Sequence, residues 1–410
     1  MKRLLRELLA LLVLYLNAPN AWSAGYSFTN IADTTTVGPY GVFSTFGSPA
    51  VSGNTVAFAG GGGIFTGNGG PLKTIVKFGD FGPAGPFGIV SDPAISGDTV
   101  AFFGAFGDSL QTSGIFMGSG GPITTVALER DPAPIGTFYF FDAPAISGNT
   151  VAFSALYGHP GQEGGAGVFT GSGGPLTPIT QPNGPSSGPV GISGNTVVFG
   201  VSDVDISFIY AGSGGPLSIV VGSGDPAPVG TFRYVGKPSI SGDNVAFEGG
   251  DEGDGFIFRS SVDGSVIDTI ARGSDAPLDT FFFVTPPTIG GNDVAFLASY
   301  ANEEGTLRGE GVFIGNGGPL NTVIRTGDAL FGSAIESLFV GIPGFNLGSI
   351  GLDPDGSGNL AFKYELADGR RGIALASPIP EPNPFALAGA LIILACLIAR
   401  IRPRSAPRFS

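Results

Sequence analysis

The amino-acid sequence predicts an all-β fold, a seven-bladed β-propeller of four-stranded blades over residues 25–377. Three observations support this prediction: a recurring segment, its spacing, and glycine turns at fixed places in each repeat. The segment reads Ser-Gly-Asn-Thr-Val-Ala-Phe in its first copy and recurs, with variation, so that its copies occupy residues 52–58, 96–102, 147–153, 193–199, 241–247, 290–296 and 356–362. The first six copies start 44 to 51 residues apart, which is the length of one propeller blade.

Each repeat is expected to form four short strands. In the third repeat, β-branched and aromatic residues predict strands at residues 138–146, 150–154, 167–170 and 176–180. Ser147-Gly148-Asn149 and Gly173-Gly174-Pro175 separate the first two and the last two of these strands. Glycine and asparagine accept the positive φ angles of close hairpins, so both segments are expected to be tight turns.

The two ends of the repeat region predict how the ring closes. The last repeat stops after its third strand, at residues 372–376, and residues 26–33 resemble the fourth strand of other repeats. We therefore expect the N-terminal strand to complete the seventh blade, because such a join hides sheet edges that an open array would expose. A linear solenoid is the alternative architecture, and it would require polar caps at both ends. No helix is expected within residues 25–377.

The strand order separates two faces of the predicted propeller. The Ser-Gly-Asn and Gly-Gly-Pro turns hardly vary in length and lie on one face, whereas the other face carries loops as different as residues 59–62 and 155–166. Variable loops on a rigid scaffold are where binding usually resides, so this second face is the candidate ligand face. An aspartate recurs in its loops, at Asp80, Asp131, Asp225, Asp275 and Asp328. These residues either contribute to a ligand face or accept backbone hydrogen bonds in Gly-Asp and Asp-Pro turns.

A calcium site is a second, competing interpretation of one acidic segment. Asp353, Asp355 and Ser357 match the start of a D-x-D-x-S-G calcium loop, and carboxylate oxygens are ligands that Ca²⁺ prefers. The twelfth position of such a loop is Tyr364 rather than a bidentate Glu. The last residues of the segment also coincide with the repeat's own tight turn, so the alternative is that the segment only forms this turn.

Charge and composition narrow the functional classes. Residues 25–377 carry 12 Lys or Arg and 31 Asp or Glu, a net charge of −19, which disfavours nucleic acid and anionic lipid as partners. This region contains no cysteine, no G-x-S-x-G motif and a single histidine, His159, in a loop. The sequence therefore favours a non-enzymatic protein. A carbohydrate-active hydrolase or lyase is the alternative, and it would require two acids about 5 to 10 Å apart beside an exposed tyrosine. The tyrosines considered for sugar stacking are Tyr157, Tyr210, Tyr234 and Tyr300.

The two ends of the chain have the features of targeting segments. Residues 1–24 combine Lys2, Arg3 and Arg6 with an apolar stretch and a small-residue ending, which is typical of a secretory signal peptide. A proline-rich segment at residues 378–384 precedes an apolar run at residues 385–399, where we expect a transmembrane helix. The basic tail at residues 400–410 contains Arg400, Arg402 and Arg404, a stop-transfer cluster expected to stay in the cytoplasm.

Pro380-Glu381-Pro382, followed by the apolar run and the basic cluster, resembles the PEP-CTERM sorting signal of exported bacterial proteins. The resemblance implies that an exosortase recognises the motif, removes the tail and transfers the protein from the membrane to the cell surface or extracellular matrix. The repeats are also similar to a family of propeller-like domains of unknown function that occur with such tails. This resemblance implies a link to exopolysaccharide production. Besides the export machinery, the expected partners are extracellular polysaccharide or matrix proteins. We therefore expect a surface or matrix protein acting as a binding or structural module.

Overall fold

A computed structural model describes residues 25–107, 112–159, 164–180, 188–202, 206–278, 280–338 and 350–379. The chain divides into two compact units, one formed by residues 27–377 and one by the two terminal segments, and the first is the propeller. The predicted signal peptide, the Pro380-Glu381-Pro382 motif, the helix at residues 385–399 and the basic cluster lie outside the described residues. In the described part of the chain, no helix has the length and apolar character needed to cross a membrane.

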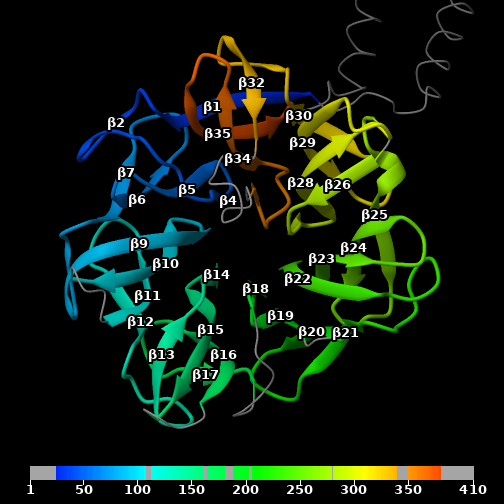
Figure 1. Ribbon diagram of the computed structural model, residues 1–410. Coiled ribbons are helices and arrows are strands. Elements are labelled where there is room, and N and C mark those ends of the chain that lie inside the picture. The colour runs from blue at the N-terminus through cyan, green and yellow to red at the C-terminus, as the bar shows by residue number, and fades with distance from the viewer. Residues whose placement is uncertain are drawn as a thin grey trace, which may run out of the picture. The chain divides into compact units, whose positions relative to one another are not determined.

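Seven antiparallel sheets, one for each predicted repeat, form the propeller (Figure 1). The strands of blades 1 to 3, in chain order, are β4 (Ala50–Ser52), β5 (Thr55–Gly60), β6 (Gly63–Gly67) and β7 (Lys73–Lys77); β8 (Phe81–Gly82), β9 (Gly85–Ser96), β10 (Thr99–Phe106), β11 (Thr112–Gly118) and β12 (Thr124–Leu128); and β13 (Thr137–Phe141), β14 (Ala145–Ser147), β15 (Thr150–Gly158), β16 (Gly165–Gly171) and β17 (Thr177–Pro178).

The strands of blades 4 to 6 are β18 (Val190–Ser193), β19 (Thr196–Ser202), β20 (Ser207–Gly212) and β21 (Ser218–Gly222); β22 (Tyr234–Ser241), β23 (Asn244–Gly250), β24 (Gly255–Ser261) and β25 (Ile267–Arg272); and β26 (Thr280–Val284), β27 (Thr288–Gly290), β28 (Asp293–Ala301), β29 (Arg308–Gly315) and β30 (Asn321–Arg325). The one helical element in the described residues is a short 3₁₀ turn, η1 (Gly273–Asp275), between blades 5 and 6.

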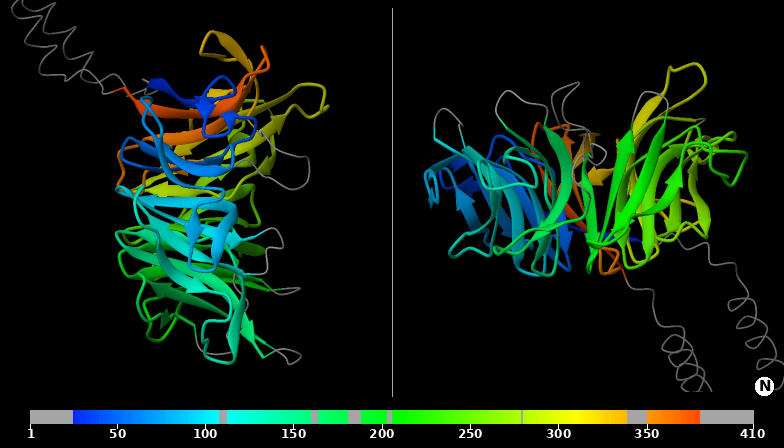
Figure 2. Two further views of the ribbon diagram at one scale, coloured as in Figure 1. Left: turned by 90° about the vertical axis from the view of Figure 1, so that its left-hand side faces the viewer. Right: turned by 90° about the horizontal axis from the view of Figure 1, so that it is seen from below.

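Blade 7 combines both ends of the propeller chain. It consists of β31 (Ala329–Leu330), β32 (Ser333–Ser337), β33 (Gly351–Leu352), β34 (Leu360–Leu366), β35 (Arg371–Pro378) and the N-terminal β1 (Tyr26–Asp33). β1 pairs with β35 as the outermost strand, which confirms the predicted closure. A small hairpin of β2 (Val37–Gly38) and β3 (Gly41–Val42) then leads the chain into blade 1. Figure 2 shows the blades edge-on, with their loops on two opposite faces.

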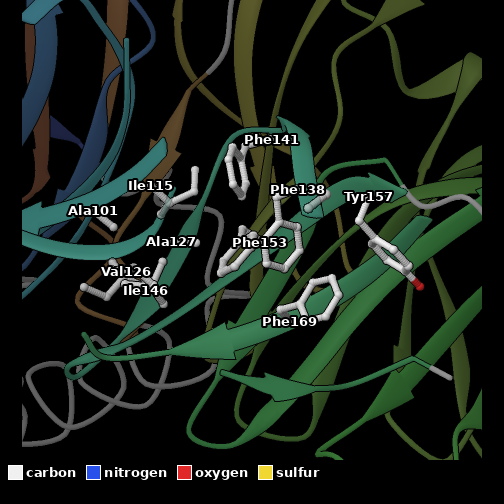
Figure 3. Packing of buried hydrophobic residues seen from close by; sticks show 12 residues of the cluster. Ala101, Ile115, Val126, Ala127, Phe138, Phe141, Ile146, Phe153, Tyr157 and Phe169 are labelled. Carbon is white, nitrogen blue, oxygen red and sulfur yellow. The ribbon is translucent and has the colours of Figure 1, made fainter. Parts of the chain in front are cut away.

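A repeated aromatic cluster forms the core of each regular blade. In blade 3, Phe153 on β15 stacks on Phe169 on β16 with ring centroids 5.8 Å apart, and Phe138 meets Phe169 edge-on at 5.1 Å (Figure 3). Blade 5 repeats the edge-on contact with Phe232 and Phe258 at 4.9 Å. Burial of a side chain of this size stabilises a fold by about 1.5–3 kcal/mol, and the edge-on geometry adds to that value. The Phe that ends each repeated segment is therefore a core residue of its blade.

Hydrogen bonds between successive blades use the serine that opens each of the first five repeated segments. Its hydroxyl oxygen accepts the backbone N–H of the turn glycine in the next blade, at donor–acceptor distances of 2.9–3.0 Å, in the pairs Ser52–Gly97, Ser96–Gly148, Ser147–Gly194, Ser193–Gly242 and Ser241–Gly291. From blade 7 to blade 1, the Asp353 Oδ1 accepts the Gly53 N–H at 2.9 Å. The turns thus link neighbouring blades around the ring, from blade 1 to blade 6 and from blade 7 back to blade 1.

The sixth repeat carries Gly290 where the first five have serine, and the structure explains the difference. A Cβ atom at Gly290 would lie 2.1 Å from the carbonyl oxygen of Asp353, so no side chain fits there. Ser241 instead reaches blade 7, because its hydroxyl donates to the carbonyl oxygen of Pro354 at 2.6 Å. The Ser241 hydroxyl therefore bonds to both blade 6 and blade 7, across the position where the sixth repeat has no serine.

We expect replacement of Ser147 by alanine to lower the free energy of unfolding by about 1 kcal/mol, because the Gly194 N–H loses its acceptor at the contact between blades 3 and 4. Chemical denaturation monitored by fluorescence or circular dichroism would measure the change. Ser172→Ala is the matched control, since Ser172 is an exposed serine in the other turn of the same blade. Equal stability of the two variants would contradict the role assigned to Ser147.

Candidate functional site

The variable-loop face carries the loops between the second and third strands of each blade and the loops that lead to the next blade. The five predicted aspartates all lie there, each in the loop that leaves a fourth strand, and each accepts the backbone N–H of the residue three positions earlier. The donor–acceptor distances are 2.7–3.0 Å at Asp80, Asp131, Asp225, Asp275 and Asp328. These hydrogen bonds are those expected if the aspartates stabilise turns. The five aspartates lie in five separate loops.

The described residues contain no cluster of three or more His, Cys, Asp or Glu side chains placed to hold a metal ion. Asp353 is buried and holds the Gly53 N–H, whereas Asp355 is exposed. The Ser357 hydroxyl accepts the backbone N–H of Asn359 at 3.2 Å. The three predicted calcium ligands thus form the turn at which blade 7 contacts blade 1, and the calcium site stays a prediction.

Arg130 marks a departure from the repeat in one of the aspartate loops. The residue before the aspartate has a positive φ angle in each of four loops, and it is glycine in three of them, Gly79, Gly224 and Gly327. Arg130 has a φ of 71° there, and its N–H donates to the carbonyl oxygen of Phe138 as the glycines do to theirs. A residue with a Cβ atom is strained in this conformation.

Replacement of Arg130 by glycine is expected to raise the free energy of unfolding by about 0.5–1 kcal/mol, because the relief of backbone strain exceeds the entropy that glycine adds to the unfolded chain. A denaturant titration would measure this gain. Arg130→Ala removes the same exposed side chain but keeps the strain, so it should give no comparable gain. A less stable glycine variant would overturn the interpretation.

A pocket of about 460 Å³ opens between blades 4 and 5, lined by residues at the variable-loop ends of their strands. Its polar and aromatic lining comes from Arg233, Tyr234, Lys237 and Glu248, with Gly200, Ser202, Ile206 and Ser207 of blade 4 opposite. The Arg233 N–H donates to the carbonyl oxygen of Gly250 at 2.7 Å, which holds the start of the inner strand in place. A pocket of this volume is in the range of small-molecule sites.

Backbone irregularity shapes the basic side of this pocket. Between Gly236 and Ser239 the register of β22 against β23 shifts, so β22 contains one more residue than its partner over this stretch. Lys237 lies within this bulge with a φ of 46°, and its ammonium group pairs with the Glu248 carboxylate at 3.2 Å. Bulges redirect side chains and concentrate at functional sites, and non-glycine residues at positive φ carry strain. This pocket is therefore our candidate site.

Tyr234 supplies the aromatic surface of the candidate site. It is 50% exposed, and partial burial, together with the nearby Glu248 carboxylate, raises the pKa of its hydroxyl above the usual value of 10, so the phenol stays protonated at neutral pH. Of the other tyrosines considered for sugar stacking, Tyr157 and Tyr300 are buried in blade cores and Tyr210 is partly buried. Tyr234 alone of the four offers a ring face to solvent.

Two other blades expose aromatic side chains at the same place, a feature that the sequence analysis missed. Tyr139 and Phe140 at the start of blade 3 are 50% and 52% exposed, and Phe282 in blade 6 is 56% exposed. Each follows a Thr-Phe pair whose Phe is buried, as Tyr234 follows Thr231-Phe232. The recurrent Thr-Phe followed by further aromatic residues is the signal that could have revealed them.

The model of a protein family of unknown function, DUF7453, matches residues 42–345. The chain belongs to the DUF7453 family. A comparison with curated proteins gave no match. The DUF7453 match covers almost all of the repeat region, and the family description specifies no activity.

Solved structures similar to this DUF7453 protein include the acylaminoacyl peptidase of Pyrococcus horikoshii, with 15% identity and a TM-score of 0.51, where the match covers 84% of this chain and 53% of the peptidase. The β-propeller domain of the Trilobed protease from Pyrococcus furiosus matches with 12% identity and a TM-score of 0.39 over 70% of this chain and all of that domain. The chain spans about half the length of the horikoshii peptidase, and the likeness concerns the fold alone.

Proposed function

We propose that this protein is an exported, non-enzymatic binding module of the cell surface or extracellular matrix, sorted through its C-terminal segment. The terminal sequences support this proposal: a signal-like segment at residues 1–24 and a PEP-CTERM-like motif, apolar run and basic cluster at the other end. An exosortase and the export machinery are then its processing partners. The propeller is the part that remains outside the cell.

We further propose that the variable-loop face binds extracellular glycan, with the pocket between blades 4 and 5 as the principal site. The observation that carries this proposal is a half-exposed Tyr234 beside Arg233, Lys237 and Glu248 in one pocket. Sugars are bound by an aromatic surface for their apolar face and by polar groups for their hydroxyls. Among the described residues, Glu248 is the pocket's one carboxylate, and its ion pair with Lys237 favours binding over the two-acid chemistry of a glycosidase.

Replacement of Tyr234 by alanine is expected to weaken glycan binding about fivefold to tenfold, because loss of an aromatic contact costs about 1–1.4 kcal/mol. Calorimetry or affinity electrophoresis with polysaccharide from a producing strain would measure the loss. Tyr40→Ala is the control, because Tyr40 is 60% exposed and lies outside the pocket. Equal loss in both variants, or in neither, would refute this site.

Intact mass of the protein from membrane and medium fractions tests the sorting proposal. We expect loss of the segment after the Pro380-Glu381-Pro382 motif in a host that carries an exosortase, and its retention in a host that lacks one. Replacement of the three motif residues by alanine should restore retention in the first host. Full retention of residues 385–410 in both hosts would contradict sorting and leave a membrane-anchored protein.

A further inference from the structure

The pocket between blades 4 and 5 gathers positive charge in a strongly acidic protein. Residues 25–377 contain only 12 Lys or Arg, and two of these pair with an acid three positions away, Lys77 with Asp80 and Arg325 with Asp328. Arg233 and Lys237, by contrast, line one pocket from the same inner strand region. In the described part of the chain, no ion pair joins Arg233 to a carboxylate.

The chemistry of the four lining side chains is asymmetric. Glu248 neutralises Lys237 at 3.2 Å and, with it, offers an acceptor and a donor to sugar hydroxyls. Arg233 remains as a planar donor whose paired N–H groups match the two oxygens of a carboxylate. Tyr234 provides an adjacent, half-exposed ring. An aromatic surface beside one unneutralised guanidinium suits a sugar that carries a carboxylate.

We infer that this pocket takes a carboxylated sugar unit, of the uronic acid class, with its ring against Tyr234 and its carboxylate at Arg233. The inference rests on the proposed glycan-binding function and specifies the ligand of the same site. The backbone at Lys237 supports the inference. Lys237 has a strained φ of 46° within the bulge, where a glycine would be unstrained, and such strained residues cluster at functional sites.

Overall charge sets the length of the ligand. The net charge of −19 on residues 25–377 repels long polyanions at distances up to about 10 Å at 0.1 M salt, whereas a short chain or a chain end presents few charges outside the pocket. The site therefore suits an oligosaccharide of a few units or the terminus of a polymer, rather than the middle of an acidic polysaccharide.

Calorimetry with short oligogalacturonate, oligomannuronate and hyaluronan fragments, each compared with its carboxyl methyl ester, tests the inference, since the ester lacks the negative charge and adds only one methyl group per carboxyl group. The unmodified protein and four variants would be measured: Arg233→Met, Tyr234→Ala, Lys237→Gly and the control Arg130→Met, which removes another exposed arginine from a different blade of the same face. We expect at least one acid form to bind tenfold or more tightly than its ester.

In the expected result, Arg233→Met removes the preference for the acid form, Tyr234→Ala weakens acid and ester alike, and Arg130→Met changes neither. Lys237→Gly should weaken binding while keeping or raising the melting temperature, because glycine relieves the positive φ angle. That combination separates a ligand role from a structural one.

Three results would overturn the inference. Equal binding of acid and ester, with both weakened by Tyr234→Ala, would leave the glycan-binding function standing and remove the carboxylate. A preference for the acid that survives Arg233→Met would place the carboxylate elsewhere. Absence of binding to any fragment, together with absence of binding to the polysaccharide of a producing strain, would refute both the inference and the proposed function.

Discussion

The pairing of β1 with β35 is the constraint on which the rest of the propeller depends. It joins the first strand of the repeat region to the last, so that blade 7 is completed by residues more than 300 positions apart. Phe28 meets Phe362 edge-on at 6.2 Å, and the Tyr364 hydroxyl donates to the Asn30 side-chain oxygen at 3.1 Å. Without this join, blades 1 and 7 would each lose a packing partner and expose sheet edges.

The two faces of the ring have different tasks. On one face, short turns and their serine hydroxyls bind each blade to the next, and the departures at Gly290 and Asp353 follow from the space available between blades 6, 7 and 1. That regularity holds the blades in register, so the loops on the other face can vary without affecting the ring. The recurring aspartates belong to this scaffold too, because each stabilises the loop that leads into the next blade.

The candidate site occurs where the repeat is broken rather than where it is kept. Lys237 lies in a β-bulge that interrupts the pairing of β22 with β23. Arg233 and Tyr234 occupy exposed positions next to the buried Phe232. A ring of similar blades positions such deviations with little cost to its own stability, since the aromatic residues of blades 3 and 5 belong to separate buried clusters. Function can therefore change in one interblade pocket while the remaining blades keep the scaffold rigid.

The sequence by itself determined the number of blades, their strand order and the closing strand, because each depends on local patterns that repeat. Val56, Ala57 and Phe58 are all buried, and in five repeats a glycine with a positive φ angle follows the serine at the tight turn. The sequence also allowed two roles for the recurring aspartates, in a ligand face or as acceptors of backbone hydrogen bonds in turns. Only the tertiary structure decided that Asp353 contacts blade 1, that Tyr157 is buried while Tyr234 is exposed, and that Arg233 and Lys237 face Ser207 of the preceding blade. These features depend on contacts between repeats and on a bulge at Lys237, and neither is encoded in the periodicity of a single repeat.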